Sequence, residues 1–328
     1  MHPAGGVDDC GDSSHRQNDG ALTSAHESPG EGLTIHCPAS CPNSALQREK
    51  PMRMLLRTLF LGLAAASLSP AWATASDCGD AAALVQQAYP KARKSADGAS
   101  FTLEPHTSIA LTHSDYDPPG LVCKIWPAHD NLMLVAVPLI DSAQSVEGQH
   151  VGDIELLVVD RKSLQVRQRL LQPGLMSDDA IAIRGIEFDT GRYGLAPKVT
   201  AFGLRIDMAN HSQVNPFSQT GLRLYALDGD ALRMVLDGLV VAGNGGEGDS
   251  NCAGSFHSSQ VSLAMSRASH HGYHDITAVE RIDTDEPSVD KDGECQSHPG
   301  KSVTRTYRLR YDGSRYPVPE PLKALGPP

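Results

Sequence analysis

After residue 75 the sequence has no apolar run of the roughly 20 residues that a membrane-spanning helix needs. It also has no excess of basic residues. Residues 76–328 contain 23 lysines and arginines against 32 aspartates and glutamates, a net charge of −9. Nucleic acids and anionic lipids both require a basic face, so the composition argues against both as partners. No other partner is indicated.

Motifs for covalent catalysis and phosphate binding are missing as well. No G-x-S-x-G sequence occurs. Ser288 and Lys291 form an S-x-x-K pattern, but they follow Pro287 in an acidic stretch that does not favour the helix this pattern requires. Residues 300–302 read GKS, without a glycine at the spacing of a phosphate loop. The sequence therefore indicates neither a catalytic nucleophile nor a cofactor.

Residues 52–75 have the order of a secretory signal peptide. Arg53 and Arg57 supply a basic start, the mostly apolar run over residues 55–68 includes Arg57, Pro70 follows that run, and A-x-A sequences come next. Cleavage is expected just before Thr74 or Ser76. The apolar run is too short for a transmembrane anchor. We therefore expect the mature protein to be periplasmic or secreted.

The stretch before this signal is polar and has no apolar periodicity. Residues 1–51 are rich in Gly, Ser, His, Pro and Asp, a composition typical of disordered segments. Since a signal peptide acts at an N-terminus, translation is expected to start at Met52 or Met54; the alternative is a signal peptide with an unusually long n-region. The sequence then predicts one exported domain over residues 76–328, whose first part, residues 76–127, holds a helix and a disulfide.

Four cysteines remain after residue 75, and an even number in an exported chain predicts two disulfides. Cys78 and Cys123 lie near the N-terminal end of this region, whereas Cys252 and Cys295 lie near its C-terminal end. We therefore predict the pairs Cys78–Cys123 and Cys252–Cys295. The spacings do not fit zinc-binding patterns.

The expected secondary structure is one short helix followed by strands. Asp80 can cap a helix over residues 79–89, which Pro90 ends. Short runs rich in β-branched and aromatic residues follow, bounded by turn residues, and predict an all-β architecture. The predicted strands are 106–112, 121–126, 132–140, 153–160, 164–171, 181–188, 198–206, 221–227, 231–242, 256–265, 273–282, 303–311 and 315–318.

A weak repeat suggests how these strands are connected. LLVVDRKSLQVR at 156–167 and LYALDGDALRMV at 224–235 both place an aspartate after a strand and before a turn. Asp312 and Gly313 predict a third hairpin. The pattern fits an antiparallel meander, a sandwich or a propeller-like arrangement; ordinary reuse of Asp-Gly turns is the favoured explanation, because the repeat is only a few residues deep.

The C-terminal region carries a loose family resemblance. HHGYHDITAVERI at 270–282 and TYRLRYDGSRYPV at 306–318 resemble β-rich periplasmic proteins in which a GYxDI strand precedes a YxYDGxxY hairpin, somewhat like FG-GAP repeats. The resemblance implies β-structure and export. The D-x-D-x-D-G calcium loop of FG-GAP repeats is missing at Asp275, so the resemblance implies no calcium site.

Two candidate ion sites depend on clustered side chains. His270, His271 and His274 are the densest histidine group, and histidine is the commonest transition-metal ligand. On a strand, His270 and His274 would share one face and His271 the other. Surface histidines in a turn would give the same pattern. Acidic residues at 283–294 lack EF-hand spacing, which indicates a solvated loop.

The stretch NGGEGDSN at 244–251 is the predicted ligand-binding element. Its glycines favour a loop, which would present Glu247, Asp249 and Asn251 and be anchored by Cys252. A long connection between strands would have the same composition.

No catalytic group is assembled in the sequence, which favours a non-catalytic periplasmic binding or accessory module. The alternative is a secreted hydrolase of glycans or esters, with a carboxylate pair drawn from Glu247, Asp249 and Asp275.

Overall fold

The computed structural model describes residues 78–112 and 119–325. The predicted signal peptide at 52–75, its cleavage site and the upstream residues 1–51 lie outside the described residues. Within the described ranges, no helix is both long enough and apolar enough to cross a membrane.

The described chain is mostly antiparallel β-structure with one short α-helix near its N-terminal end, as the sequence predicts. The elements are α1 (Ala81–Ala88), β1 (Arg93–Lys94), β2 (Ser100–Thr102), β3 (Thr107–Ala110), β4 (Val122–Ile125), β5 (Leu132–Asp141), β6 (Gly152–Asp160), β7 (Val166–Gln172), β8 (Ala182–Ala196), β9 (Val199–Ala209), β10 (Phe217–Asp228), β11 (Ala231–Gly248), β12 (Gly254–His270), β13 (Tyr273–Asp285), β14 (Ser288–Val289), β15 (Cys295–Gln296), β16 (Val303–Leu309) and the 3₁₀ helix η2 (Glu320–Leu322).

Helix α1 forms for the local reasons that its sequence indicates. Oδ1 of Asp80 accepts a hydrogen bond from the Ala83 backbone N–H at 2.9 Å, which satisfies one of the free donors at the helix start. Leu84, Val85 and Ala88 lie on the buried side and pack on the first sheet. The predicted helix is confirmed.

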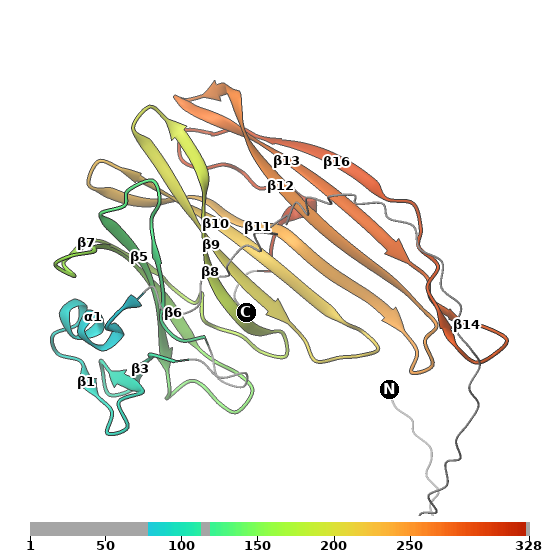
Figure 1. Ribbon diagram of the computed structural model, residues 1–328, viewed down its shortest axis with the longest axis horizontal. Helices are drawn as coiled ribbons and strands as arrows, with labels where there is room; N and C mark the ends of the chain where they lie inside the picture. Colours follow the sequence, from blue (N-terminus) through green and yellow to red (C-terminus); the bar gives the residue numbers. More distant parts are fainter. Residues whose placement is uncertain (1–77, 113–118, 326–328) are drawn as a thin grey trace, which may run out of the picture. The chain divides into compact units, whose positions relative to one another are not determined.

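The strands form two seven-stranded antiparallel sheets (Figure 1). The first follows the order β1-β2-β3-β5-β6-β7, and β4 also pairs with β5. The second follows the order β16-β13-β12-β11-β10-β9-β8. Strands β14 and β15 form a separate ribbon. Neighbouring strands are mostly consecutive in the chain, so the described part has the meander connections that the sequence allows, rather than propeller blades.

Most predicted strands are confirmed. Those between residues 106 and 311 correspond to β3–β13 and β16. The prediction for 315–318 is wrong, because this segment follows a real turn at Asp312 but forms no strand. The sequence does not predict the short strands β1, β2, β14 and β15, since two or three residues carry no measurable alternation.

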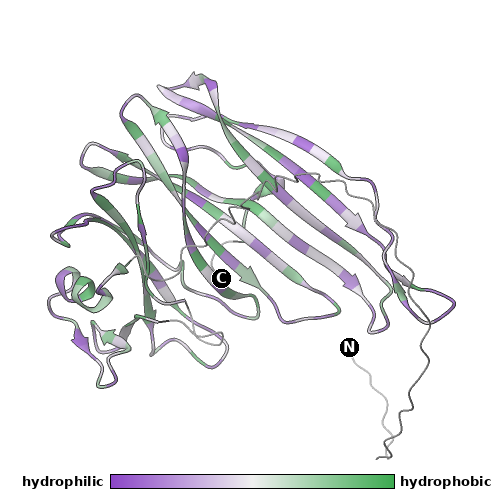
Figure 2. Cartoon of the chain, in the orientation of Figure 1, coloured by the Kyte–Doolittle hydropathy of each residue, from purple (hydrophilic) through white to green (hydrophobic). Residues whose placement is uncertain are grey.

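The two sheets are held together through a shared core. On β5, Met133, Val135 and Val137 face a cluster with α1, whereas Leu134 and Ala136 face a second cluster that includes residues of β8–β11. Both faces of β5 are therefore buried, and its hydropathy is nearly continuous (Figure 2).

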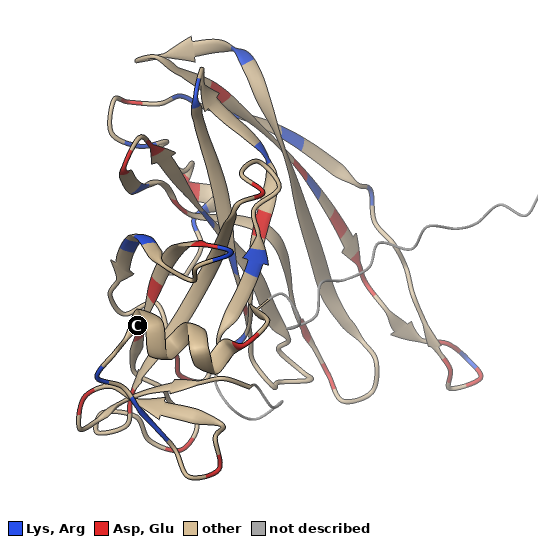
Figure 3. Ribbon diagram, turned by 60° about the vertical axis from the view of Figure 1, so that its left-hand side comes forward, with Lys and Arg blue, Asp and Glu red and all other residues tan. Residues whose placement is uncertain are grey.

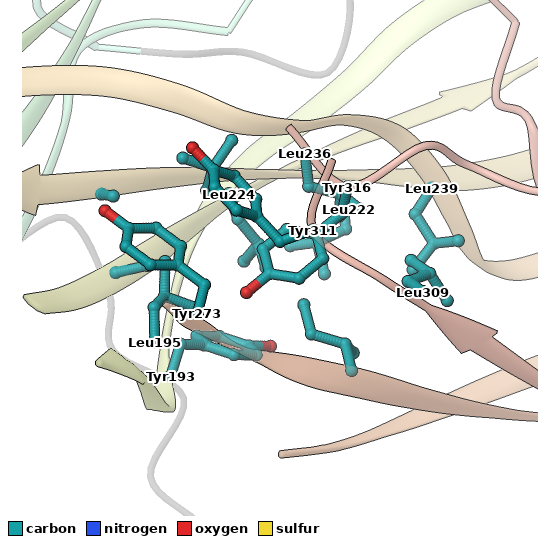
Figure 4. Packing of buried hydrophobic residues seen from close by; sticks show 14 of the residues in the cluster. Tyr193, Leu195, Leu222, Leu224, Leu236, Leu239, Tyr273, Leu309, Tyr311 and Tyr316 are labelled. Atoms are coloured by element: carbon teal, nitrogen blue, oxygen red, sulfur yellow. The ribbon is translucent and has the colours of Figure 1, made fainter. Parts of the chain in front are cut away.

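A third cluster covers the other face of the second sheet (Figure 4). It joins Tyr193 and Leu195 of β8 to Tyr273 of β13 and to Tyr311 and Tyr316, which follow β16. Residues near both edges of the second sheet thus meet in one core, because β8 also contacts β13 directly.

Both predicted disulfides are present. Cys78 is bonded to Cys123, which ties the start of α1 to β4, and Cys252 is bonded to Cys295. Two disulfides suggest an oxidising environment outside the cytoplasm. Lys, Arg, Asp and Glu are interspersed along the described strands and turns (Figure 3).

Candidate functional site

The β11–β12 pairing covers only part of β11. Register partners run from Ala242 to Gly248 on β11, so the earlier part of β11 is not paired with β12. Residues 310–325, here called the C-terminal strap, come to this free edge. Within the strap, the backbone N–H of Tyr316 donates to the Val235 carbonyl at 2.7 Å, and that of Ala324 donates to the Gly238 carbonyl at 2.7 Å. The strap's helix η2 contacts β11 (Figure 1).

The start of the strap is anchored by a part-buried polar network around three tyrosines, Tyr273, Tyr311 and Tyr316, which Figure 4 shows. Arg233 donates to the hydroxyl oxygens of Tyr311 at 2.7 Å and Tyr273 at 2.6 Å, and the rings of these two tyrosines stack with centroids 4.4 Å apart. Tyr316 donates its hydroxyl to the His274 carbonyl at 2.7 Å. Burial, followed by the nearby Tyr273 and Tyr311, raises the pKa of Tyr316. These contacts position the strap against the sheet.

A β-bulge lies beneath the end of the strap. Leu222 pairs with Leu239 and Leu224 pairs with Leu236, so Arg223 alone faces two residues of β11, Asp237 and Gly238. Gly238 has φ +67°, which side-chain-bearing residues rarely adopt. Bulges of this kind redirect side chains and occur often beside binding sites.

The bulge places an arginine and an aspartate together. Arg223 is only 7% exposed, and its Nε donates to Oδ1 of Asp237 at 2.9 Å. Within the described ranges, neither Nη group of Arg223 has a hydrogen-bond partner. A β-carbon built on Gly238 would lie 3.8 Å from Nη2, so the bare glycine leaves space beside the guanidinium.

The strap and the bulge line an open pocket of about 490 Å³. Its charged lining consists of Arg223 and Asp237 from the sheet and Asp312, Arg315 and Lys323 from the strap. Apolar lining comes from Pro317 and Val318. The volume lies in the range of small-molecule sites, which combine apolar walls with a few polar groups.

The strap's charged residues differ in how far they are already paired. Asp312 accepts backbone hydrogen bonds from Arg315 and Ser314, and these bonds lower its pKa. Lys323 forms an ion pair with Glu320. Arg315 is exposed and forms no ion pair with any described residue.

The prediction of a loop over 244–251 is wrong for its first five residues, which belong to strand β11. Gly246 pairs with Phe256, and β-carbons built on Gly246, Gly248 and Gly254 would lie 2.4, 2.8 and 2.6 Å from the Phe256 ring. The glycines therefore make room for an aromatic ring, whereas the sequence analysis attributed them to loop freedom.

The predicted ligand-binding residues lie around this hairpin. Glu247 is exposed opposite Ser255, and Oδ1 of Asp249 accepts from the Asn251 backbone N–H at 2.8 Å. Cys252 follows in the turn, bonded to Cys295. The anchoring disulfide is confirmed, and the three residues' role in binding stays a prediction.

The carboxylates of the alternative hydrolase hypothesis are far apart. Glu247 of β11 pairs with Ser255 of β12, and Asp275 of β13 is next to Ile276, which pairs with Met265 of β12. Ser255 and Met265 are ten residues apart along β12. This separation corresponds to roughly 33 Å at the spacing of residues in a strand. The fold therefore does not bring Asp275 into a pair with Glu247.

The three histidines are also placed differently from one another. Nδ1 of His270 lies 2.6 Å from Oδ1 of Asp275, a carboxylate with no exposed surface whose other oxygen has no partner among the described residues. His271 is in the turn with φ +49°. His274 lies on β13, and its buried Nδ1 likewise has no partner in the described part. Across the described ranges, no group of three His, Cys, Asp or Glu side chains could hold a metal ion.

No sequence pattern predicts the charged residues of this pocket, which include Arg223, Asp237, Arg315 and Lys323. They lie about 100 residues apart at the extremes and form no motif, because the bulge and the strap bring them together. Comparison of the chain with protein-family models, curated proteins and solved structures finds no match in any of the three. The resemblance to FG-GAP-like periplasmic proteins therefore stays a prediction.

Proposed function

We propose that this chain is an exported, non-catalytic binding module and that the pocket under the C-terminal strap is its ligand site. The buried Arg223 carries the proposal, because its Nη groups border a pocket of about 490 Å³ without a protein partner among the described residues. In the described part, the buried side-chain atoms without a partner are Nδ1 of His274 and Oδ2 of Asp275, so the Nη groups of Arg223 remain open to water in the pocket. A ligand would replace this water as their hydrogen-bond partner. The two disulfides and the predicted signal peptide support a periplasmic or secreted location.

The test is mapping of ligand contacts by NMR. The protein from residue 76 onward is titrated with small molecules of each charge class: glucose, choline, glycine, benzoate and phenyl phosphate. We expect at least one class to shift the amide resonances of Gly238 and Ala324 in a saturable way. If none of the five does so, the proposed site is refuted.

A variant distinguishes this pocket from the β11–β12 hairpin. Glu247→Ala with Asp249→Ala removes two exposed carboxylates and is expected to leave both stability and binding unchanged, since exposed charges contribute little. The opposite result has two parts: the double variant loses binding, and ligand leaves the Gly238 and Ala324 resonances of the parent protein unchanged. The ligand would then bind at the hairpin, which would contradict the proposal.

A further inference from the structure

The geometry points to a small organic oxyanion, a carboxylate or a phosphate ester, as the ligand that joins Arg223 of the sheet to the cations of the strap. This inference rests on the proposed function and deepens it by naming the ligand class. It follows from the hydrogen-bond geometry of Arg223, the charges around it, the size of the pocket and the way the strap is attached.

The first step concerns the free face of the guanidinium. Because Nε of Arg223 donates to Asp237, Nη1 and Nη2 remain as two roughly parallel donors. Such a pair matches the two oxygens of a carboxylate or phosphate, and charge-assisted bonds of this type are about twice as strong as neutral ones. Asp237 holds the guanidinium in place from its other side.

The second step concerns burial. Arg223 is 7% exposed as a whole residue, and its Nη groups keep surface that faces the pocket. An anion bound to a guanidinium with so little exposure is screened less by water than one bound at the open surface. A neutral hydroxyl would accept from one of the two Nη groups, whereas the two oxygens of a carboxylate or phosphate would accept from both.

The third step is the charge balance of the lining. Arg223, Arg315 and Lys323 face Asp237 and Asp312, which leaves one positive charge in a chain whose formal net charge is −11. Glu320 pairs with Lys323 and weakens its contribution. The balance therefore fits a ligand with one or two negative charges and disfavours a cation or a polyanion.

The fourth step is size. A pocket of about 490 Å³ is much larger than a bare ion, and Pro317 and Val318 supply an apolar wall. An anionic group attached to a small organic body uses both the guanidinium and this wall.

The last step concerns the strap. Arg315 and Lys323 lie on the strap, and Arg223 lies on β10 of the sheet. Few backbone hydrogen bonds join the strap to the sheet at the pocket, so a bound anion would add a link between them. Ligands that bind only the assembled arrangement stabilise it. We therefore expect the anion to slow amide hydrogen exchange of residues 316–324.

The experiment uses four probes that share one ring and differ in the attached group: benzoate, phenyl phosphate, benzyl alcohol and benzylamine. Affinity is measured by calorimetry at low salt, and strap protection by hydrogen-exchange mass spectrometry. We expect benzoate or phenyl phosphate to bind and protect the strap, and the two non-anionic probes to bind at least tenfold more weakly. The stronger of the two anions identifies the head group.

Three variants test the assigned residues. Arg223→Lys keeps the charge but loses the paired donors, and we expect affinity for the anion to fall about 10- to 100-fold. Arg315→Gln with Lys323→Gln alters only exposed strap residues and should weaken binding and abolish strap protection. Arg308→Gln, which removes an exposed charge on β16 outside the pocket, is the matched control and should bind as the parent does.

Two results would overturn this inference. If benzyl alcohol or benzylamine shifts the Gly238 and Ala324 amides while neither anion does, the pocket is a ligand site for another chemistry, and only the ligand class fails. If Arg223→Lys and the double strap variant bind benzoate and phenyl phosphate as tightly as the control does, the anion is held elsewhere.

Discussion

The backbone N–H of Ala324 donates to the carbonyl oxygen of Gly238 with an N–O distance of 2.7 Å, although 86 residues separate them in the chain. This bond brings the end of the strap over two glycines. A β-carbon built on Gly221 would lie 3.1 Å from that of Ala324, and one on Gly238 would lie 3.5 Å away. The strap therefore packs tightly on Gly221 of β10, whereas a β-carbon at Gly238 would make an ordinary contact and the glycine there suits the φ of +67° instead.

Gly221→Ala should displace the end of the strap. The added methyl group would lie closer to Ala324 than the 3.5–4.0 Å of a favourable carbon contact. We expect the free energy of unfolding to fall by about 1 kcal/mol and the Ala324 amide to exchange faster. Urea unfolding and hydrogen exchange measure the two effects.

Ala324→Gly in the same background tests the cause, because it removes the other methyl group and should restore both values. Gly194→Ala in β8, where nothing lies within 4 Å of the built β-carbon, is the matched control. The strap contact is not responsible if the double variant remains as unstable as Gly221→Ala.

The two disulfides should contribute unequally to stability. Their sequence separations are 45 and 43 residues, so loop entropy predicts about 4 kcal/mol for each. Cys78 and Cys123 are buried in the cluster beneath α1, whereas Cys295 is exposed. Replacing the first pair with alanines loses core packing as well, so we expect it to lower the unfolding free energy further than replacing the second pair. Urea titration of both variants decides this, and equal losses would contradict it.

Stability should depend on pH through Asp189. Burial alone would raise the pKa of this carboxyl group, but hydrogen bonds from Arg205 at 2.6 and 2.9 Å, with others from Gly191 and Tyr193, lower it overall. A carboxyl group with a lowered pKa in the folded state stabilises that state above its unfolded pKa of about 3.9. This contribution is lost as the pH falls through the lower folded-state pKa.

Asp189→Asn should therefore reduce the unfolding free energy at pH 7 and give a shallower loss of stability as the pH falls below about 4. Denaturant unfolding at several pH values measures both slopes. Asp249→Asn, an exposed carboxylate, serves as the control and should keep the parent slope. An unchanged slope in Asp189→Asn would show that the Arg205 pair is not linked to acid stability.

Several features were predictable because short segments determine them. The Asp80 cap precedes a helix-favouring run, and apolar runs bounded by turn residues identify strands as long as β5 and β6. The disulfide pairs follow from clustering of the cysteines along the chain. In each case the residues that determine the feature are close in sequence or form a recognisable pattern along the chain.

The 244–251 stretch shows where such reasoning fails. Glycine is compatible with a loop and also with a strand that packs under an aromatic ring, and only the position of Phe256 distinguishes the two. The failed strand at 315–318 has a similar origin. Its sequence fits a hairpin, but its edge contacts go to Val235 on β11 rather than to β16.

By itself, the sequence determined the all-β class, the single helix, the disulfide pairs and most strand positions. The tertiary structure alone decided that Arg223 would share a pocket with Arg315 and Lys323. The physical reason is that one extra residue in β11 turns Asp237 and Gly238 toward Arg223, and a strap from the end of the chain occupies the edge that β12 leaves free. Neither event leaves a periodic signal, because each depends on contacts between residues far apart in the chain.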